Sequence, residues 1–198
     1  MRRYALMFVA IAVLAGCAST ERWLEDAQWY EANNYPDKAE EYYTKVLDKE
    51  PENAQVYYYM GRNKNRETKL LLIQRTRYSA TAPGSLEATV DQDSLRAINE
   101  RIRNCHLEAI ENFLRALELD PSLNEAYYPL ANSYFETSQY DMAIYYYEQV
   151  QKRDPDNVQA VIFLGQCYDA KGDRSKAREY YQQAVDMGSY KARELLNG

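Results

Sequence analysis

Apolar and small residues recur at intervals of three and four along residues 124–157, with polar residues between them. Counted from Asn124, positions 4, 7, 8, 11, 20, 24 and 27 hold Tyr127, Leu130, Ala131, Tyr134, Ala143, Tyr147 and Val150. Such intervals place residues on one face of a helix, so the stretch predicts two helices that pack against each other. Pro155 cannot continue a helix and marks the step to the next unit.

The same arrangement returns on both sides of this stretch. From Val158, positions 7, 8, 11, 20, 24 and 27 hold Leu164, Gly165, Tyr168, Ala177, Tyr181 and Ala184. A unit that starts at Thr20 has Trp23, Ala27, Tyr30, Ala39, Tyr43, Val46 and Pro51 in its regular positions. One such helix pair cannot bury its apolar face alone, but stacked neighbours can. We therefore predict an all-α solenoid of helical hairpins.

This spacing of small, aromatic and proline positions resembles the tetratricopeptide repeat, which has a period of 34 residues. The resemblance covers most of the chain and implies a single domain over residues 20–198. Its repeats are expected at about residues 20–53, 54–121, 124–157 and 158–187. A short helix at 190–196 is expected to cap the open end of the stack.

The second repeat is too long for this period. Pro51 and Pro121 are 70 residues apart, whereas prolines one repeat apart would be separated by 34. Either the excess is a degenerate repeat, or both helices of the second repeat are lengthened into a protruding hairpin. Apolar residues continue at spacings of three and four from Leu95 to Ala116, which favours the hairpin. We place the insertion at about residues 65–100, with its turn near 79–85.

The first residues resemble the signal of a bacterial lipoprotein. Arg2 and Arg3 precede a short apolar run that ends in Leu14-Ala15-Gly16-Cys17, a sequence similar to the lipobox. The resemblance implies that residues 1–16 are removed, that Cys17 carries lipid with acyl chains such as palmitate, and that residues 17–19 form a short tether. It also implies a place in the cell envelope, in the outer membrane facing the periplasm. The alternative is an ordinary secretory signal followed by a chance cysteine.

The distribution of charge along the chain singles out one basic segment, residues 62–77. The formal net charge is −6, and most of the 20 tyrosines fall in regular positions, where they serve packing. Against this acidic background, residues 62–77 hold six bases and one acid. The segment is either a solvated helix face or a docking surface for an acidic partner or for anionic lipid head groups. Nucleic acid is not an expected partner, because export would place this surface in the wrong compartment.

Few residues could carry chemistry. His106 is the single histidine, and Cys105 beside it points about 100° away around the helix, so the two make a poor ligand pair or catalytic pair. We interpret His106 as a partly exposed helix residue. Cys105 and Cys167 lie a full repeat apart and are expected to be free, largely buried thiols. The sequence thus predicts no catalytic residue, no metal site, no cofactor and no small-molecule substrate.

The resemblance also implies a binding surface, because the first helices of tetratricopeptide repeats line a concave groove. The positions that we assign to a partner-binding groove are Tyr58, Arg62, Arg66, Tyr128, Asn132, Phe135, Ile162 and Gln166. Their apolar members are not needed within their own repeats, so they either anchor a peptide or cover neighbouring repeats. The carboxylate clamp of chaperone-binding relatives is not reproduced, since its lysine and asparagine positions hold Leu24, Gln28 and Tyr59.

From these features we expect a membrane-anchored scaffold of the cell envelope that is not an enzyme and binds a peptide or helix of an envelope protein. The chain resembles small tetratricopeptide lipoproteins, including the pilotins of type IV pili, which implies the assembly of an outer-membrane machine. The alternative is a regulatory adaptor of a cell-wall enzyme, which would use the basic hairpin residues 62–77 as its contact. An enzyme would need a cleft of perturbed acids and bases, which the sequence does not indicate.

Overall fold

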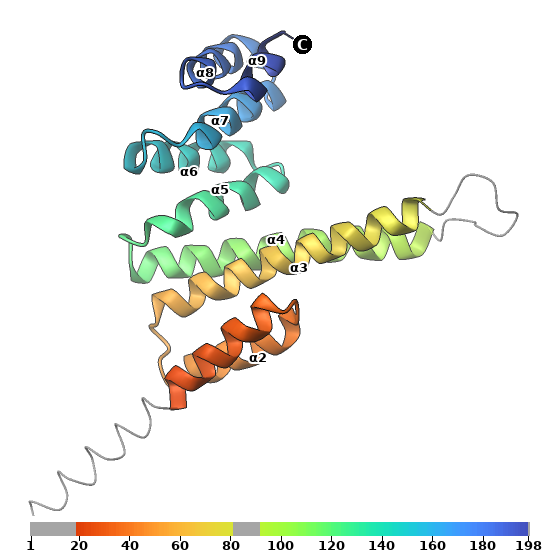
Figure 1. Cartoon of the computed structure of the whole chain (residues 1–198), viewed down its shortest axis with the longest axis vertical. Helices are drawn as coiled ribbons and strands as arrows, with labels where there is room; N and C mark the ends of the chain where they lie inside the picture. Colours follow the sequence, from red (N-terminus) through yellow and green to blue (C-terminus); the bar gives the residue numbers. More distant parts are fainter. Residues whose placement is uncertain (1–18, 81–91, 198) are drawn as a thin grey trace, which may run out of the picture.

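The computed structural model describes residues 19–80 and 92–197, and every regular element within these ranges is helical (Figure 1). Residues 19–32 are helical. The elements that follow are α2 (Pro36–Leu47), α3 (Ala54–Ala80), α4 (Gln92–Leu119), the short 3-10 turn η1 (Asn124–Ala126), α5 (Tyr127–Glu136), α6 (Tyr140–Arg153), α7 (Val158–Ala170), α8 (Arg174–Asp186) and α9 (Tyr190–Asn197). The predicted all-α array of hairpins is confirmed.

The helices form a stack in chain order, in which each helix packs against the next (Figure 1). The α3/α4 pair is far longer than the others and extends well beyond the side of the stack. The second repeat is therefore one lengthened hairpin rather than two repeats, as the uninterrupted periodicity predicted. At the C-terminal end α9 packs on α8 as the expected capping helix.

The turns that join or end the paired helices of the regular repeats share one backbone conformation. Each contains a residue with positive φ: Asn34 (64°), Ser138 (60°), Gly172 (83°) and Gly188 (91°). In each turn the next amide donates back across the helix end, as from Gln139 N to the Tyr134 carbonyl oxygen at 2.9 Å. This satisfies carbonyls that the helix leaves unpaired and fixes the angle at which the chain reverses.

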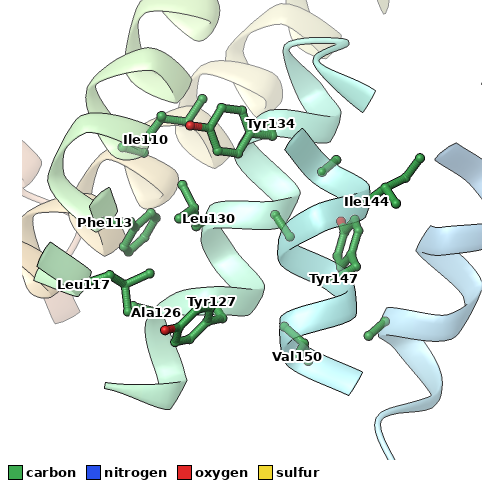
Figure 2. Packing of buried hydrophobic residues seen from close by; sticks show 14 of the residues in the cluster. Ile110, Phe113, Leu117, Ala126, Tyr127, Leu130, Tyr134, Ile144, Tyr147 and Val150 are labelled. Carbon is green, nitrogen blue, oxygen red and sulfur yellow. The ribbon is translucent and has the colours of Figure 1, made fainter. Parts of the chain in front are cut away.

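The main core runs through α4, α5, α6 and α7, where Phe113, Leu130 and Tyr147 are fully buried (Figure 2). Small residues at position 8 of the repeats allow this close packing, as the sequence predicted. A Cβ atom on Gly61 would lie 2.7 Å from the Phe113 ring, and one on Gly165 would lie 2.5 Å from the Tyr181 ring. Both distances are too short for van der Waals contact, so each glycine is required by the aromatic ring that covers it.

Candidate functional site

A cavity of about 1150 Å³ lies where the α3/α4 hairpin leaves the stack. Its walls come from four parts of the chain: the end of the first helix at Glu31 with the turn at Asn34, then α3, α4, and α5 with the turn after it. The hollow therefore spans three successive repeats. It exists because α3 and α4 continue past the turns of the flanking repeats, whose ends then form its sides (Figure 1).

Each of the three helices presents one continuous face to the cavity. The faces repeat at i, i+3, i+4 and i+7, which is the spacing of one side of a helix. They are Arg62, Asn65, Arg66 and Lys69 of α3; Asn99, Ile102, Arg103 and His106 of α4; and Pro129, Asn132, Ser133 and Glu136 of α5. The fully buried Ser133 hydroxyl lies 3.0 Å from the Pro129 carbonyl oxygen and 3.3 Å from Asn65 Oδ1, so α5 and α3 are in contact at this wall of the cavity.

Glu31 forms a buried anionic centre at one wall of the cavity. Its side chain is only 2% exposed and accepts three hydrogen bonds: from the Tyr43 hydroxyl at 2.8 Å, and from Arg62 Nε and Nη2 at 2.9 Å each. The hydrogen bonds to Glu31 raise the pKa of Arg62, while burial, assisted by the nearby Glu31 charge, raises the pKa of Tyr43. Arg62 thus joins α3 to the first helix by a bidentate, charge-assisted contact.

The other bases of the cavity differ in how far they are neutralised. Arg66 Nε donates to Asn34 Oδ1 at 3.1 Å, and its Nη1 lies 3.9 Å from Glu31 Oε1. Arg75 donates to Asn99 Oδ1 at 3.2 Å. Lys69 and Arg103 are exposed, and neither has an ion-pair partner within residues 19–80 and 92–197. The cavity therefore retains positive charge that the described part of the protein does not balance.

His106 lies buried at the back of this site, with 9% of its surface exposed. Its Nδ1 atom has no hydrogen-bond partner among the described residues. Burial lowers the pKa of His106, and the charge of Glu136 opposes this effect only in part. The expectation of a partly exposed helix residue was wrong, because the lengthened hairpin packs against α5 and covers this position.

A second group of charged residues lies outside the cavity and is internally paired: Lys64, Glu67, Arg101 and Glu108 of the hairpin, and Glu40 of α2. Lys64 Nζ contacts Glu40 Oε2 at 2.6 Å and Glu108 Oε2 at 2.7 Å, and Arg101 Nη2 contacts Glu67 Oε1 at 2.7 Å. Burial acts to lower the pKa of Lys64, but its hydrogen bonds to Glu108 and Glu40 outweigh burial and raise it. Much of the basic segment 62–77 therefore joins helices within the protein.

The eight residues that the sequence assigned to a groove do not form one surface. Arg62, Arg66 and Asn132 line the cavity, and Asn132 Oδ1 also accepts a hydrogen bond from the Tyr147 hydroxyl at 2.5 Å. Phe135 and Gln166 border a separate shallow hollow between α5, α7 and the α8–α9 end of the stack.

The assumption that the apolar groove residues are free of internal packing was wrong. Tyr58 and Tyr128 are half-buried, with ring centroids 6.0 Å from those of Phe113 and Tyr147, respectively. Ile162 is fully buried and clusters with Ala192, because the capping helix α9 covers it. Cys17 lies outside the described residues.

The groove assignment missed Lys69, Arg103 and His106, which the structure brings together in the cavity. The available signal was the helical spacing of Arg62, Arg66 and Lys69 within the basic segment. The positions on α4 had no such signal, because α4 begins at Gln92, well before the point at which the second helix of a regular repeat would start.

Two features are absent from residues 19–80 and 92–197. No group of three or more histidine, cysteine, aspartate or glutamate side chains could hold a metal ion there. No helix in these ranges combines the length and apolar character needed to cross a bilayer. Cys105 and Cys167 are both free and buried, as predicted, and burial raises the pKa of each thiol to about 12.

The stack and its cavity define a helical repeat scaffold, a class in which neighbouring repeats jointly present one extended binding surface. Residues 128–192 match the family model described as tetratricopeptide repeat. Residues 128–192 are therefore tetratricopeptide repeats, and the rest of the described chain continues the same helical-hairpin fold; such repeats serve protein–protein interaction and are typically not enzymatic.

One solved structure shares this fold, and two others are similar to the chain at lower TM-scores. The MamA structure designated AMB-1 is 15% identical, with a TM-score of 0.59, over 90% of this chain and 85% of that chain. A second MamA crystal structure is 24% identical, with a TM-score of 0.44, over 88% of this chain and 94% of that one. YrrB, described as a tetratricopeptide protein with an unusual peptide-binding site, is 19% identical, with a TM-score of 0.45, over 92% and 94% of the two chains. The comparison with curated proteins gave no match.

Proposed function

We propose that this protein is a lipid-anchored scaffold of the bacterial cell envelope that holds a peptide segment of a partner protein in the cavity beside the α3/α4 hairpin. The observation that carries the proposal is the cavity itself, which spans three repeats and has about 1150 Å³ of space. Small-molecule sites usually occupy about 300–1,000 Å³, so this hollow has room for a short peptide segment. Its walls offer amide, hydroxyl and charged groups together with aliphatic side chains.

A pair of tryptophan substitutions on α4 tests the use of the cavity. Asn99 is exposed and lines the hollow, whereas its neighbour Glu100 is equally exposed and does not. We expect Asn99→Trp to obstruct the cavity and Glu100→Trp to leave it open, with little effect of either on folding. Crosslinking in intact envelopes, followed by affinity capture of the full chain, should lose a specific partner only in Asn99→Trp. Equal capture by both variants would place the contact elsewhere.

The anchor is proposed from the lipobox-like sequence that ends at Cys17, and it is tested separately. Cys17→Ala should abolish incorporation of labelled fatty acid and leave the protein uncleaved or released from the membrane fraction. Several acyl chains make anchoring stable where a single chain is reversible, so the expected loss is nearly complete. Retention of an unlipidated Cys17→Ala protein in the outer membrane would refute this part. A role in assembling an outer-membrane machine such as a type IV pilus then depends on which partner the crosslinks identify.

The alternative, a regulatory adaptor of a cell-wall enzyme that binds through the basic hairpin, is favoured by one observation. The α3/α4 pair extends well beyond the stack and would reach a separate partner (Figure 1). Arg62 and Lys64, however, are held in internal ion pairs and offer little to such a partner. The adaptor would therefore depend on bases nearer the tip, such as Arg77, and Arg77→Glu should then remove its partner while Asn99→Trp does not.

A further inference from the structure

The cavity beside the hairpin has the opposite charge to the rest of the protein. The whole chain has 24 basic and 30 acidic residues. The cavity lining contains five bases, Arg62, Arg66, Lys69, Arg75 and Arg103, and two acids, Glu31 and Glu136. Positive charge gathered in a hollow with protein walls concentrates anionic ligands there.

Internal pairing leaves two of these bases, Lys69 and Arg103, without an ion-pair partner in the described ranges. Arg62 donates two hydrogen bonds of 2.9 Å to Glu31, so the charges of this base and this acid neutralise each other. Glu136 is the only other acid among the described residues of the cavity lining and can balance no more than one of the remaining bases of α3 and α4. Lys69 and Arg103 reach the hollow from different helices. An anion in the hollow would therefore be approached by charges from two sides.

Apolar and amide groups define the rest of the ligand. Ile73 is 50% exposed although it lines the cavity, and Ile102, which also lines it, is half-buried. The Oδ1 atoms of Asn65 and Asn132 contact Ser133 and Tyr147, respectively, and their Nδ2 groups can donate to the carbonyl oxygens of a peptide backbone. From this combination we propose that the cavity selects acidic peptide segments, in which aspartate or glutamate side chains flank an aliphatic side chain. The proposal rests on the peptide-binding function proposed above and names the chemistry of the partner.

A peptide fits this surface better than a lipid bilayer, the other common anionic target of a basic segment. A bilayer presents its head groups in a plane, which requires bases on a flat or convex surface. Here Lys69 and Arg103 belong to the lining of a hollow enclosed by three repeats, which a single extended chain can enter. Lys69 lies in the inserted part of the hairpin and Arg103 lies just after it, so the selectivity depends on the lengthened hairpin.

Selection from a random peptide library on the immobilised full chain tests the inference without assuming the ligand. The test variant is Lys69→Glu/Arg103→Glu. The matched control is Arg77→Glu/Arg96→Glu, which makes the same charge change on the same two helices at exposed positions outside the cavity. Wild type and the control should enrich acidic peptides that contain an aliphatic residue. Affinity for one such synthetic peptide should fall about tenfold in the test variant and should weaken with added salt.

The possible outcomes separate the two levels of the proposal. Enrichment of neutral or basic peptides that still require an open cavity, as judged with Asn99→Trp, would overturn the acidic selectivity and leave the peptide-binding function intact. Enrichment of no peptide by any form of the protein would count against both. An equal loss of peptide affinity in the test and control variants would show that only the overall charge of the protein matters, which would overturn the selectivity of the cavity. Binding to vesicles of anionic phospholipid that is lost only in Lys69→Glu/Arg103→Glu, without peptide binding, would assign the cavity to lipid.

Discussion

The repeats from α5 to α8 and the distal half of the α3/α4 hairpin are both antiparallel helix pairs, yet different forces stabilise them. The repeats have neighbours on both sides, and their rings and aliphatic side chains form a continuous core that includes the fully buried Leu130 and Tyr147 (Figure 2). The distal hairpin has no repeat above or below it (Figure 1). Its apolar core is a small cluster of Leu71, Ile98 and Cys105, with Ile102 packed beside them.

Polar contacts compensate for this small core near the base of the hairpin. Lys64 connects α3 to α2 through Glu40 and to α4 through Glu108, and Arg62 binds the buried Glu31. Ion pairs of this kind demand correct geometry and do not add stability in proportion to their number. In this protein the distal half of the hairpin, here called the arm, projects from a base that is tied to the preceding repeat by these ion pairs. We expect the arm to be the less stable region.

Truncating one leucine in each region should give the largest effects. Leu130→Ala should cost about 2–5 kcal/mol, since Leu130 is fully buried between three helices that cannot easily collapse around the gap. Leu71→Ala should lower the free energy of unfolding by about 2 kcal/mol, because Leu71 has fewer packed neighbours and these can relax more easily around the gap. Urea unfolding followed by circular dichroism measures both. Equal losses would show that the arm is as tightly integrated as the stack.

Removing the arginine that binds Glu31 should lower the stability by less than Leu130→Ala does. Arg62→Met leaves a carboxylate that is 2% exposed without its principal partner, with Arg66 still 3.9 Å away. Breaking a buried pair costs about 3–5 kcal/mol, and we expect about 2–3 here because Arg62 itself is 44% exposed. Glu31→Gln added to Arg62→Met should recover part of the loss, which a double-mutant cycle measures. As a control, Arg115→Met removes an exposed pair with Glu118 and should change stability by less than about 1 kcal/mol.

The two free cysteines report on local opening of the two regions. Cys105 lies in the hairpin cluster and Cys167 in the core of the stack, and burial raises the pKa of both thiols to about 12. Both should resist alkylation in the folded protein. If the arm opens locally, Cys105 should react at least about tenfold faster than Cys167 in mild denaturant, as located by mass spectrometry. Equal rates at all urea concentrations would indicate that arm and stack unfold as one unit.

Much of the fold could be predicted from the sequence because each repeat independently specifies its small and aromatic positions. The lengthened hairpin followed from the unbroken periodicity of Leu95 to Ala116. The candidate site was harder to predict from the sequence, because a groove assignment taken from regular repeats cannot include α4 positions such as Arg103. Nor does the sequence reveal that α9 covers Ile162, or that Arg62 is engaged by a buried acid 31 residues earlier in the chain. Pairing of charges and burial by distant elements are properties of the assembled stack.

His106 gives the smallest expected effect and tests whether the junction of arm and stack is as closed as its burial indicates. Burial lowers its pKa below the ordinary value of about 6.5, so the unfolded chain takes up a proton at a pH where the folded protein does not. Stability from the neutral ring is therefore complete above about pH 6.5 and is lost as the pH falls through the lowered pKa. His106→Gln removes this titration and keeps a polar side chain. The melting temperature of wild type should fall relative to that of His106→Gln as the pH is lowered from about 7.5 to 5.5. This fall should be smaller than the fall in melting temperature that Leu71→Ala causes. Parallel pH profiles would mean that His106 is as accessible to protons in the folded protein as in the unfolded chain, and that the arm separates readily from α5.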